Sequence, residues 1–248
     1  ESLCKWFAKK IGFNDSSGGI AASGGTLSNL NALIAARHNS GLGSDPNSVL
    51  LVSEDAHSSF IKCIRIMGLD EANLIRIKTD NNGSIDIQNL RKTIDRCFID
   101  KKKIFAIVAT LGTTVRGAID PIKDISEICK ERNIWLHIDG SIGGIFAITS
   151  IPIEGLNNIN QANSITINPQ KIIGITKTSS LLLVSEMSTL ENTFSTGLPY
   201  LSSNEDIINR GEIGIQGSRP AEVIKLWLGL RFLGLNGIEN ILKSSIKR

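Results

Sequence analysis

Apolar residues follow two alternating patterns along the chain. Short runs rich in Val, Ile and Leu are typical of buried strands. These runs occur at 49–52, 74–77, 104–109, 134–138, 164–167 and 180–184. Between them, apolar residues recur every three or four positions, as on one face of a helix. Such stretches lie at 28–38, 58–67, 87–97 and 122–128. Strands that alternate with helices predict an α/β fold, in which helices cover both faces of a mainly parallel sheet.

Three further helix signals lie near the ends and in the middle of the chain. Residues 3–10 have helical spacing, and an amphipathic helix is expected over 221–233, ending at Gly234. Asp120 and Pro121 predict the start of the helix that continues through 122–128, with the aspartate as its N-cap and the proline as its first helical residue.

Polar residues follow several of the predicted strands. The residues at or just beyond the ends of apolar runs are His57, Thr113, Thr114, Asp139 and Lys171. Ligands of open α/β sheets bind beyond the carboxyl ends of the strands. We therefore expect a binding site at this edge of the sheet.

Composition and charge narrow the classes of partner. The chain has 248 residues, of which 41% are hydrophobic and 21% charged, which fits one large globular domain. The net charge is only +3, and the run at 101–103 is expected on a solvated loop, so no nucleic-acid partner is expected. No apolar run reaches the length of a membrane span and no secretion signal opens the chain, so no membrane partner is expected.

The number and spacing of the cysteines indicate whether the chain binds a metal and whether it resides in a reducing compartment. The four cysteines form no Cys-x-x-Cys pair, and with three histidines there is no zinc pattern, so no metal site is expected. Scattered free thiols fit a reducing compartment, and a cytoplasmic location is expected. The chain opens with Glu1 and an immediate helical pattern, which indicates a fragment or a trimmed chain.

The segment Ser23-Gly24-Gly25-Thr26 leads into the first long helical stretch, which is expected to start near Ser28. Two glycines let the backbone approach a ligand closely. The free N–H groups and positive dipole of a helix N-terminus attract an anion. An ordinary glycine turn with a Ser/Thr cap explains the same residues. The segment matches neither a Walker A loop nor a dinucleotide fingerprint.

Asp139, His57 and Lys171 each have an ordinary explanation and a chemical one. A carboxylate at a strand end often only caps a turn, a histidine at a helix start often has no function, and a lone lysine is usually solvated. The same three residues could pair with the nitrogen of a pyridine ring, stack on that ring and form a Schiff base. Together with a glycine–threonine anion loop, their order along the chain matches the parts of a pyridoxal-phosphate site.

The chain resembles the group II pyridoxal-phosphate-dependent amino-acid decarboxylases, a family that includes glutamate, aromatic amino-acid, diaminobutyrate and cysteine-sulfinate decarboxylases. The resemblance covers roughly residues 20–237. The matching motifs are Ser23-Gly24-Gly25-Thr26, Asp55-Ala56-His57, Gly112-Thr113-Thr114, Gly117-Ala118-Ile119-Asp120-Pro121-Ile122, Trp135-Leu136-His137-Ile138-Asp139-Gly140, Asn168-Pro169-Gln170-Lys171, Gly217-Ser218-Arg219 and Lys225-Leu226-Trp227-Leu228.

The resemblance implies a role for each matched residue. Lys171 carries the cofactor covalently, Asp139 pairs with the pyridine nitrogen, and His57 stacks on the ring. The residues implied at the phosphate or near the ring substituents are Gly25, Thr26, Asn168, Thr114 and Ser141. Arg219 matches an arginine near the active site whose role is less defined.

Three departures from the family pattern stand out. Gln170 replaces the histidine that usually precedes the lysine, and Gly140-Ser141-Ile142 replaces Ala-Ala-Tyr after the aspartate. The only tyrosine is Tyr200, and the segment after it, 202–216, lacks the tyrosine that often delivers a proton to the substrate's Cα in this family. This region is expected to form a mobile loop, with the proton donor unidentified.

The sequence therefore predicts a fold type I large domain over residues 1–248, with a mostly parallel seven-stranded sheet, a homodimeric assembly and α-decarboxylation of an L-amino acid. The family's N-terminal segment and small C-terminal domain are expected to be largely absent. Two alternatives stay open. One is another pyridoxal-phosphate reaction on the same core, such as that of an aldehyde-lyase or an aminotransferase. The other is a truncated, inactive homologue.

Overall fold

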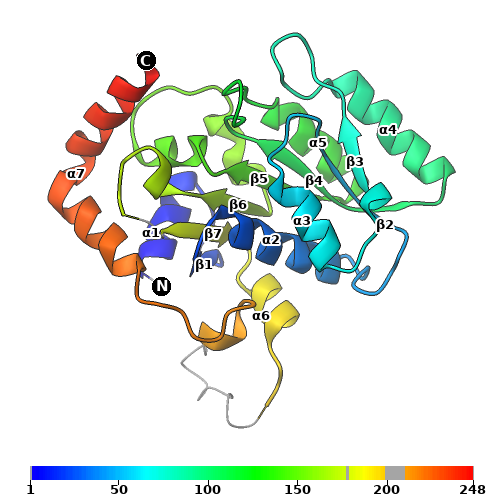
Figure 1. The fold of residues 1–248 in the computed structure, drawn as a ribbon, viewed down its shortest axis with the longest axis horizontal. Coiled ribbons are helices and arrows are strands. Elements are labelled where there is room, and N and C mark those ends of the chain that lie inside the picture. The colour runs from blue at the N-terminus through cyan, green and yellow to red at the C-terminus, as the bar shows by residue number, and fades with distance from the viewer. Residues whose placement is uncertain (1, 177–178, 199–209, 248) are drawn as a thin grey trace.

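The computed structural model describes residues 2–176, 179–198 and 210–247. Its centre is a seven-stranded sheet with the strand order β1-β7-β6-β5-β4-β2-β3 (Figure 1). The strands are β1 (Gly18–Ala22), β2 (Ser48–Ser53), β3 (Leu74–Ile77), β4 (Lys103–Thr110), β5 (Trp135–Gly140), β6 (Ser164–Ile167) and β7 (Ser180–Val184). Strands β3, β2, β4, β5 and β6 run parallel, and β7 and β1 pair antiparallel at one edge. The predicted α/β fold with a mostly parallel seven-stranded sheet is confirmed.

Helices cover the two faces of the sheet, which therefore forms the middle of three layers (Figure 1). The helices are α1 (Ser2–Ile11), α2 (Gly25–Asn39), α3 (Ser59–Ile66), α4 (Ile87–Ile99), α5 (Ile122–Arg132), α6 (Ser188–Phe194) and α7 (Val223–Ile246). Leu33 of α2 and Phe60 of α3 share one buried cluster with β2 and β4. Phe7 of α1, Leu90 of α4 and Ile125 of α5 pack in a second, larger cluster on the opposite face.

Strand β1 was not predicted from the sequence. Its residues Gly18-Gly19-Ile20-Ala21-Ala22 have low intrinsic preference for a strand, because glycine and alanine offer little side chain to pack. The pairing with β7 explains the extended backbone. A Cβ atom on Gly19 would lie 2.2 Å from the carbonyl oxygen of Leu182, so only glycine allows the two strands to come this close.

Asp120 does not cap a helix, which corrects the prediction for the start of α5. Pro121 occupies the N-cap position, and the Asp120 carboxylate instead accepts hydrogen bonds from the backbone N–H groups of Ile85 (2.8 Å) and Thr110 (2.7 Å). Burial raises the pKa of Asp120 to about 6, and the two backbone donors act in the opposite direction. The side chain ties the loop before α4 to the end of β4, a tertiary contact that local sequence cannot show.

The last helix also differs from its prediction. Helical structure does not end at Gly234 but resumes beyond it and reaches Ile246. Gly234 has φ 62° and ψ 171°, a backbone conformation that interrupts the helix and produces a kink.

Within the described residues, no helix combines the length and apolar character needed to cross a bilayer.

Candidate active site

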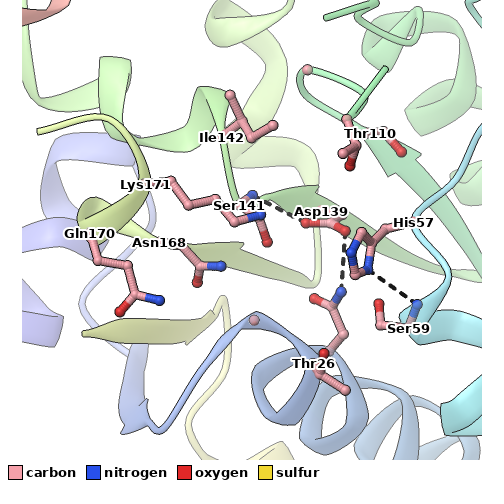
Figure 2. A pocket seen from close by; sticks show the side chains of 14 residues that line it. Thr26, His57, Ser59, Thr110, Asp139, Ser141, Ile142, Asn168, Gln170 and Lys171 are labelled. Carbon is pink, nitrogen blue, oxygen red and sulfur yellow. Dashed lines mark hydrogen bonds between the residues drawn. The ribbon is translucent and has the colours of Figure 1, made fainter. Parts of the chain in front are cut away.

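A cavity of about 270 Å³ lies at the carboxyl ends of β4, β5 and β6, next to the N-terminus of α2 (Figure 2). Its size is close to the lower end of the ~300–1,000 Å³ that is usual for small-ligand pockets. The cavity is lined by Gly25, Thr26, Asn29, His57, Ser59, Thr110, Gly112, Thr114, Asp139, Ser141, Ile142, Asn168, Gln170 and Lys171. All eight residues predicted for the site are in this set, from five separate parts of the chain.

The first turn of α2 forms one wall of the cavity. The helix begins at Gly25, three residues earlier than predicted, with Gly24 as its N-cap. Intrahelical hydrogen bonds start only at Leu27 and Ser28, which both bond to the Gly24 carbonyl, so the N–H groups of Gly25 and Thr26 remain available to a ligand. This arrangement suits an anion.

Gly25 faces the amide of Asn168 and the hydroxyl of Ser141 across a narrow gap. A Cβ atom on Gly25 would lie 2.5 Å from Asn168 Nδ2 and 2.9 Å from Ser141 Oγ. The absence of a side chain therefore keeps the gap open between helix N–H groups, an amide and a hydroxyl. Groups of these kinds are able to donate hydrogen bonds to an anion.

Asp139 lies near the end of β5, and its side chain is nearly buried. Its Oδ1 accepts a hydrogen bond from the backbone N–H of Ser141 (3.1 Å), and its Oδ2 accepts one from Asn29 Nδ2 (3.2 Å). Each oxygen has one protein donor, which leaves the carboxylate able to accept a further proton donor from the cavity.

His57 precedes α3 and is exposed on the cavity wall. Its Nδ1 accepts a hydrogen bond from the backbone N–H of Ser59 (3.1 Å). This bond fixes the plane of the imidazole and places the proton of the neutral ring on Nε2.

Lys171 ends a short 3-10 helix, Pro169–Lys171, directly after β6. Its backbone N–H bonds to the carbonyl of Asn168 (3.0 Å), and its side chain points into the cavity toward Ser141 (Figure 2). The preceding Gln170 also lines the cavity, and its Oε1 accepts a hydrogen bond from the backbone N–H of Ser179. Gln170 thus connects the lysine turn to the start of β7.

Two hydroxyl groups in the cavity wall support its use as a ligand site. Ser59 Oγ and Thr110 Oγ1 are buried and have no hydrogen-bond partner within the protein. A buried polar group without a partner costs stability, and a polar ligand can supply the partner. Together with the anion-binding gap, the Asp139 carboxylate and the accessible Lys171 amine, these groups fit pyridoxal phosphate.

Asn29, Ser59 and Thr110 are cavity residues that the sequence reading missed. Asn29 is 1% exposed in the Ala- and Leu-rich helix α2, and a fully buried amide there is the signal that could have identified it. Arg219 lies elsewhere, in a small separate cavity beside β1 and β7. Tyr200 and most of the predicted mobile loop lie outside the described residues.

Burial also shifts the pKa values of two side chains behind the cavity, those of His137 and Cys63. Burial lowers the pKa of His137 to about 4, although Asp139 and Ser164 act in the opposite direction. Burial, assisted by the charge of Asp139, raises the pKa of the Cys63 thiol to about 12. Both side chains are therefore neutral at pH 7. In the described part of the chain, no group of three or more His, Cys, Asp or Glu residues is arranged to hold a metal ion.

The fold and the cavity are those of the α/β class of pyridoxal-phosphate enzymes. The chain belongs to the family described as the pyridoxal-dependent decarboxylase conserved domain, whose model matches residues 1–248.

Known proteins similar to this chain include an aromatic-L-amino-acid decarboxylase of Bacillus atrophaeus, 31% identical over 93% of this chain and 49% of the relative. An acidic amino acid decarboxylase of Xenopus tropicalis is 31% identical over 96% of this chain and 49% of the relative. The crystal structure of mouse CSAD superposes with a TM-score of 0.91 at 25% identity, covering 99% of this chain and 53% of that structure. The chain thus spans about half the length of the relatives that it matches.

Proposed function

We propose that the protein decarboxylates an L-amino acid with pyridoxal phosphate bound in this cavity. The observation that carries the proposal is the convergence of Lys171, Asp139, His57 and the open first turn of α2 on one cavity. Family membership and the two decarboxylase relatives favour decarboxylation over transamination or aldehyde-lyase chemistry on the same core.

Bound pyridoxal phosphate takes up the electron pair that remains at Cα when the carboxylate leaves as carbon dioxide. The Lys171 amine would hold the cofactor covalently at its aldehyde carbon, whose oxygen would leave as water. The Asp139 carboxylate keeps a proton on the pyridine nitrogen, because an ionised acceptor stabilises that positive charge. The His57 ring would pack on the cofactor and limit the access of water to the reacting face.

Gly25, Thr26, Ser141 and Asn168 would hold the phosphate, and Thr114 would contact a ring substituent. This assignment is supported by the hydrogen-bond donors that lie next to Gly25, which are the helix N–H groups, the Asn168 amide and the Ser141 hydroxyl. A phosphate dianion gains from hydrogen bonds to the free N–H groups of a helix and from the positive end of its dipole.

Carbon dioxide release tests the proposal, measured for the full-length protein with a panel of aromatic and acidic L-amino acids. The panel spans the substrates named for the two relatives. We expect carbon dioxide and the corresponding amine in equal amounts from at least one substrate, with little keto acid. Keto acid as the main product would instead support an aminotransferase, and the absence of any turnover would support an inactive homologue.

We further propose a homodimer in the cytoplasm. His57, Thr114 and Lys171 are exposed in the single chain, so a second subunit could complete the cavity wall. Trp227, which is 50% exposed on α7, adds apolar surface that a second subunit could bury. The cytoplasmic location is supported separately by the four cysteines, which are free and buried and fit a reducing compartment. Light scattering coupled to size-exclusion chromatography of the full-length protein would give the mass of a dimer, and the mass of a monomer would reject that assembly.

A further inference from the structure

Every second side chain of β5 carries a hydrogen-bonding group and faces α2. Trp135, His137 and Asp139 share this face of the strand, whereas Leu136 and Ile138 point into the large apolar cluster on the other face. His137 is fully buried, and a buried imidazole needs partners for both ring nitrogens.

Both ring nitrogens of His137 have such partners. His137 Nδ1 lies 2.8 Å from Ser164 Oγ, and His137 Nε2 lies 3.1 Å from Asn29 Oδ1. Ser164 is the register partner of His137 on the neighbouring strand β6 and accepts a hydrogen bond from Trp135 Nε1 at 2.8 Å. At the other end, Asn29 Nδ2 donates to Asp139 Oδ2. The five side chains form one continuous hydrogen-bonded chain.

The donors and acceptors in this chain can be ordered from the Asp139 end. An ionised carboxylate only accepts, so the amide nitrogen of Asn29 must face Asp139 and the amide oxygen must face His137. His137 Nε2 must then carry the ring proton. The bare Nδ1 therefore accepts the hydroxyl proton of Ser164, whose oxygen accepts the indole N–H of Trp135.

Every hydrogen bond in the chain thus donates in the direction of Asp139. Turning the Asn29 amide over would reverse this order, because its oxygen would face Asp139 and the ring proton of His137 would have to move to Nδ1. The orientation of Asn29 and the tautomer of His137 are therefore linked.

We infer that His137 is a positioning residue that acts through Asn29 to hold the Asp139 carboxylate oriented toward the cofactor. The inference rests on the proposed function, because it assigns Asp139 to the pyridine nitrogen. The neutral state of His137 agrees with it, since burial lowers the pKa of this residue to about 4. A small displacement of a catalytic group can cost about 10²-fold in rate.

The test compares two replacements of His137 in the full-length protein. His137→Gln can still accept from Ser164 and donate to Asn29, whereas His137→Phe keeps a ring of similar volume and breaks both bonds. Pyridoxal phosphate labelled with ¹⁵N in its ring reports whether the pyridine nitrogen is protonated. For His137→Phe we expect a shift toward the unprotonated nitrogen, a rise of about tenfold in the cofactor Kd and a lower kcat with a smaller change in KM. In His137→Gln, the ¹⁵N shift, the cofactor Kd and kcat should stay close to those of the unaltered protein.

Ile138→Ala is the control for simple destabilisation of β5, because Ile138 is buried on the opposite face of the same strand. It should lower the melting temperature and leave the ¹⁵N shift unchanged. If His137→Phe does not fold, Ser164→Ala repeats the test. It removes the donor to His137 Nδ1 together with the acceptor of Trp135 Nε1, and should shift the ¹⁵N signal in the same direction.

An unchanged ¹⁵N shift in His137→Phe, or in Ser164→Ala if that variant replaces it, would overturn the inference. The same shift in Ile138→Ala would also overturn it. Failure of the unaltered protein to bind pyridoxal phosphate would reject the proposed function, and the inference with it. Normal binding by the unaltered protein, with no effect of the His137 or Ser164 variants, would reject the inference alone.

Discussion

Asn29 on α2 and Asp139 on β5 are joined by a 3.2 Å hydrogen bond, although 110 positions separate them in the chain. Asn29 also lies one helical turn after Gly25, so the two residues share a face of α2. The helix that offers its N-terminus to an anion therefore also holds the carboxylate at the other end of the cavity. A rigid helix thus sets the spacing between these two binding groups.

Replacing Asp139 should affect turnover far more than folding. Asp139→Asn keeps the shape of the side chain and removes the charge that we assign to the pyridine nitrogen. We expect kcat to fall by about 10²- to 10³-fold, the effect typical of losing one electrostatic contact to a reacting group. The free energy of unfolding of the cofactor-free protein, measured in urea, should change by no more than ~1–3 kcal/mol. Near-normal turnover in this variant would remove Asp139 from the mechanism.

Gly25→Ala should block the anion site at a modest cost in stability. The new methyl group would overlap Asn168 Nδ2 and Ser141 Oγ, so these two side chains must shift to admit it. We expect cofactor affinity to fall by about tenfold or more, while the cofactor-free protein still folds and unfolds at a somewhat lower temperature. The matched variant is Gly24→Ala, whose methyl group would meet no atom within 4 Å. An equal loss of affinity in both variants would argue against the gap beside Gly25 as the binding site.

Thr26→Val tests the hydroxyl at the start of α2. Valine keeps the shape of threonine and removes its hydrogen-bonding group. We expect cofactor binding to weaken by about 1–3 kcal/mol, the range for hydrogen bonds to charged groups. Thr26→Ser keeps the hydroxyl and should bind pyridoxal phosphate nearly normally. Fluorescence titration of each variant with the cofactor measures both affinities. Unchanged affinity in Thr26→Val would show that this side chain does not contact the phosphate.

The buried His137 should make stability depend on pH between about 6.5 and 4. Its pKa is about 4 in the folded protein, mainly because of burial, against 6.5 in an unfolded chain. As the pH falls through this window, the unfolded chain takes up a proton that the folded protein does not. Stability from this residue is thus present above pH 6.5 and is lost progressively toward pH 4.

His137→Gln has no group that titrates at this position and is the reference for that measurement. We expect the stability advantage of the unaltered protein over His137→Gln to shrink as the pH is lowered from 7 to 4.5, in urea titrations of the cofactor-free proteins. A difference that stays constant with pH would mean that His137 does not resist protonation in the fold.

The sequence was most informative where apolar runs are continuous. Strands β6 and β7 have the bounds that were predicted, because uninterrupted buried runs admit few other interpretations. Asp139 and Lys171 were expected near each other because the carboxyl ends of parallel strands meet at one edge of a sheet, and both line the same cavity. Asp120 was misread because its partner N–H groups come from Ile85 and Thr110, which only the folded chain brings together. Asn29 was missed for the same reason.

The central claim is that Lys171 carries the cofactor. Lys171 lies directly after β6, and its side chain points into the cavity that Asp139 and the start of α2 also line. The most direct measurement is borohydride reduction of the full-length protein with bound pyridoxal phosphate, followed by peptide mapping. The account predicts a single pyridoxyl label, on Lys171. A label on Lys177 or another lysine, or no label in protein that has bound the cofactor, would contradict it.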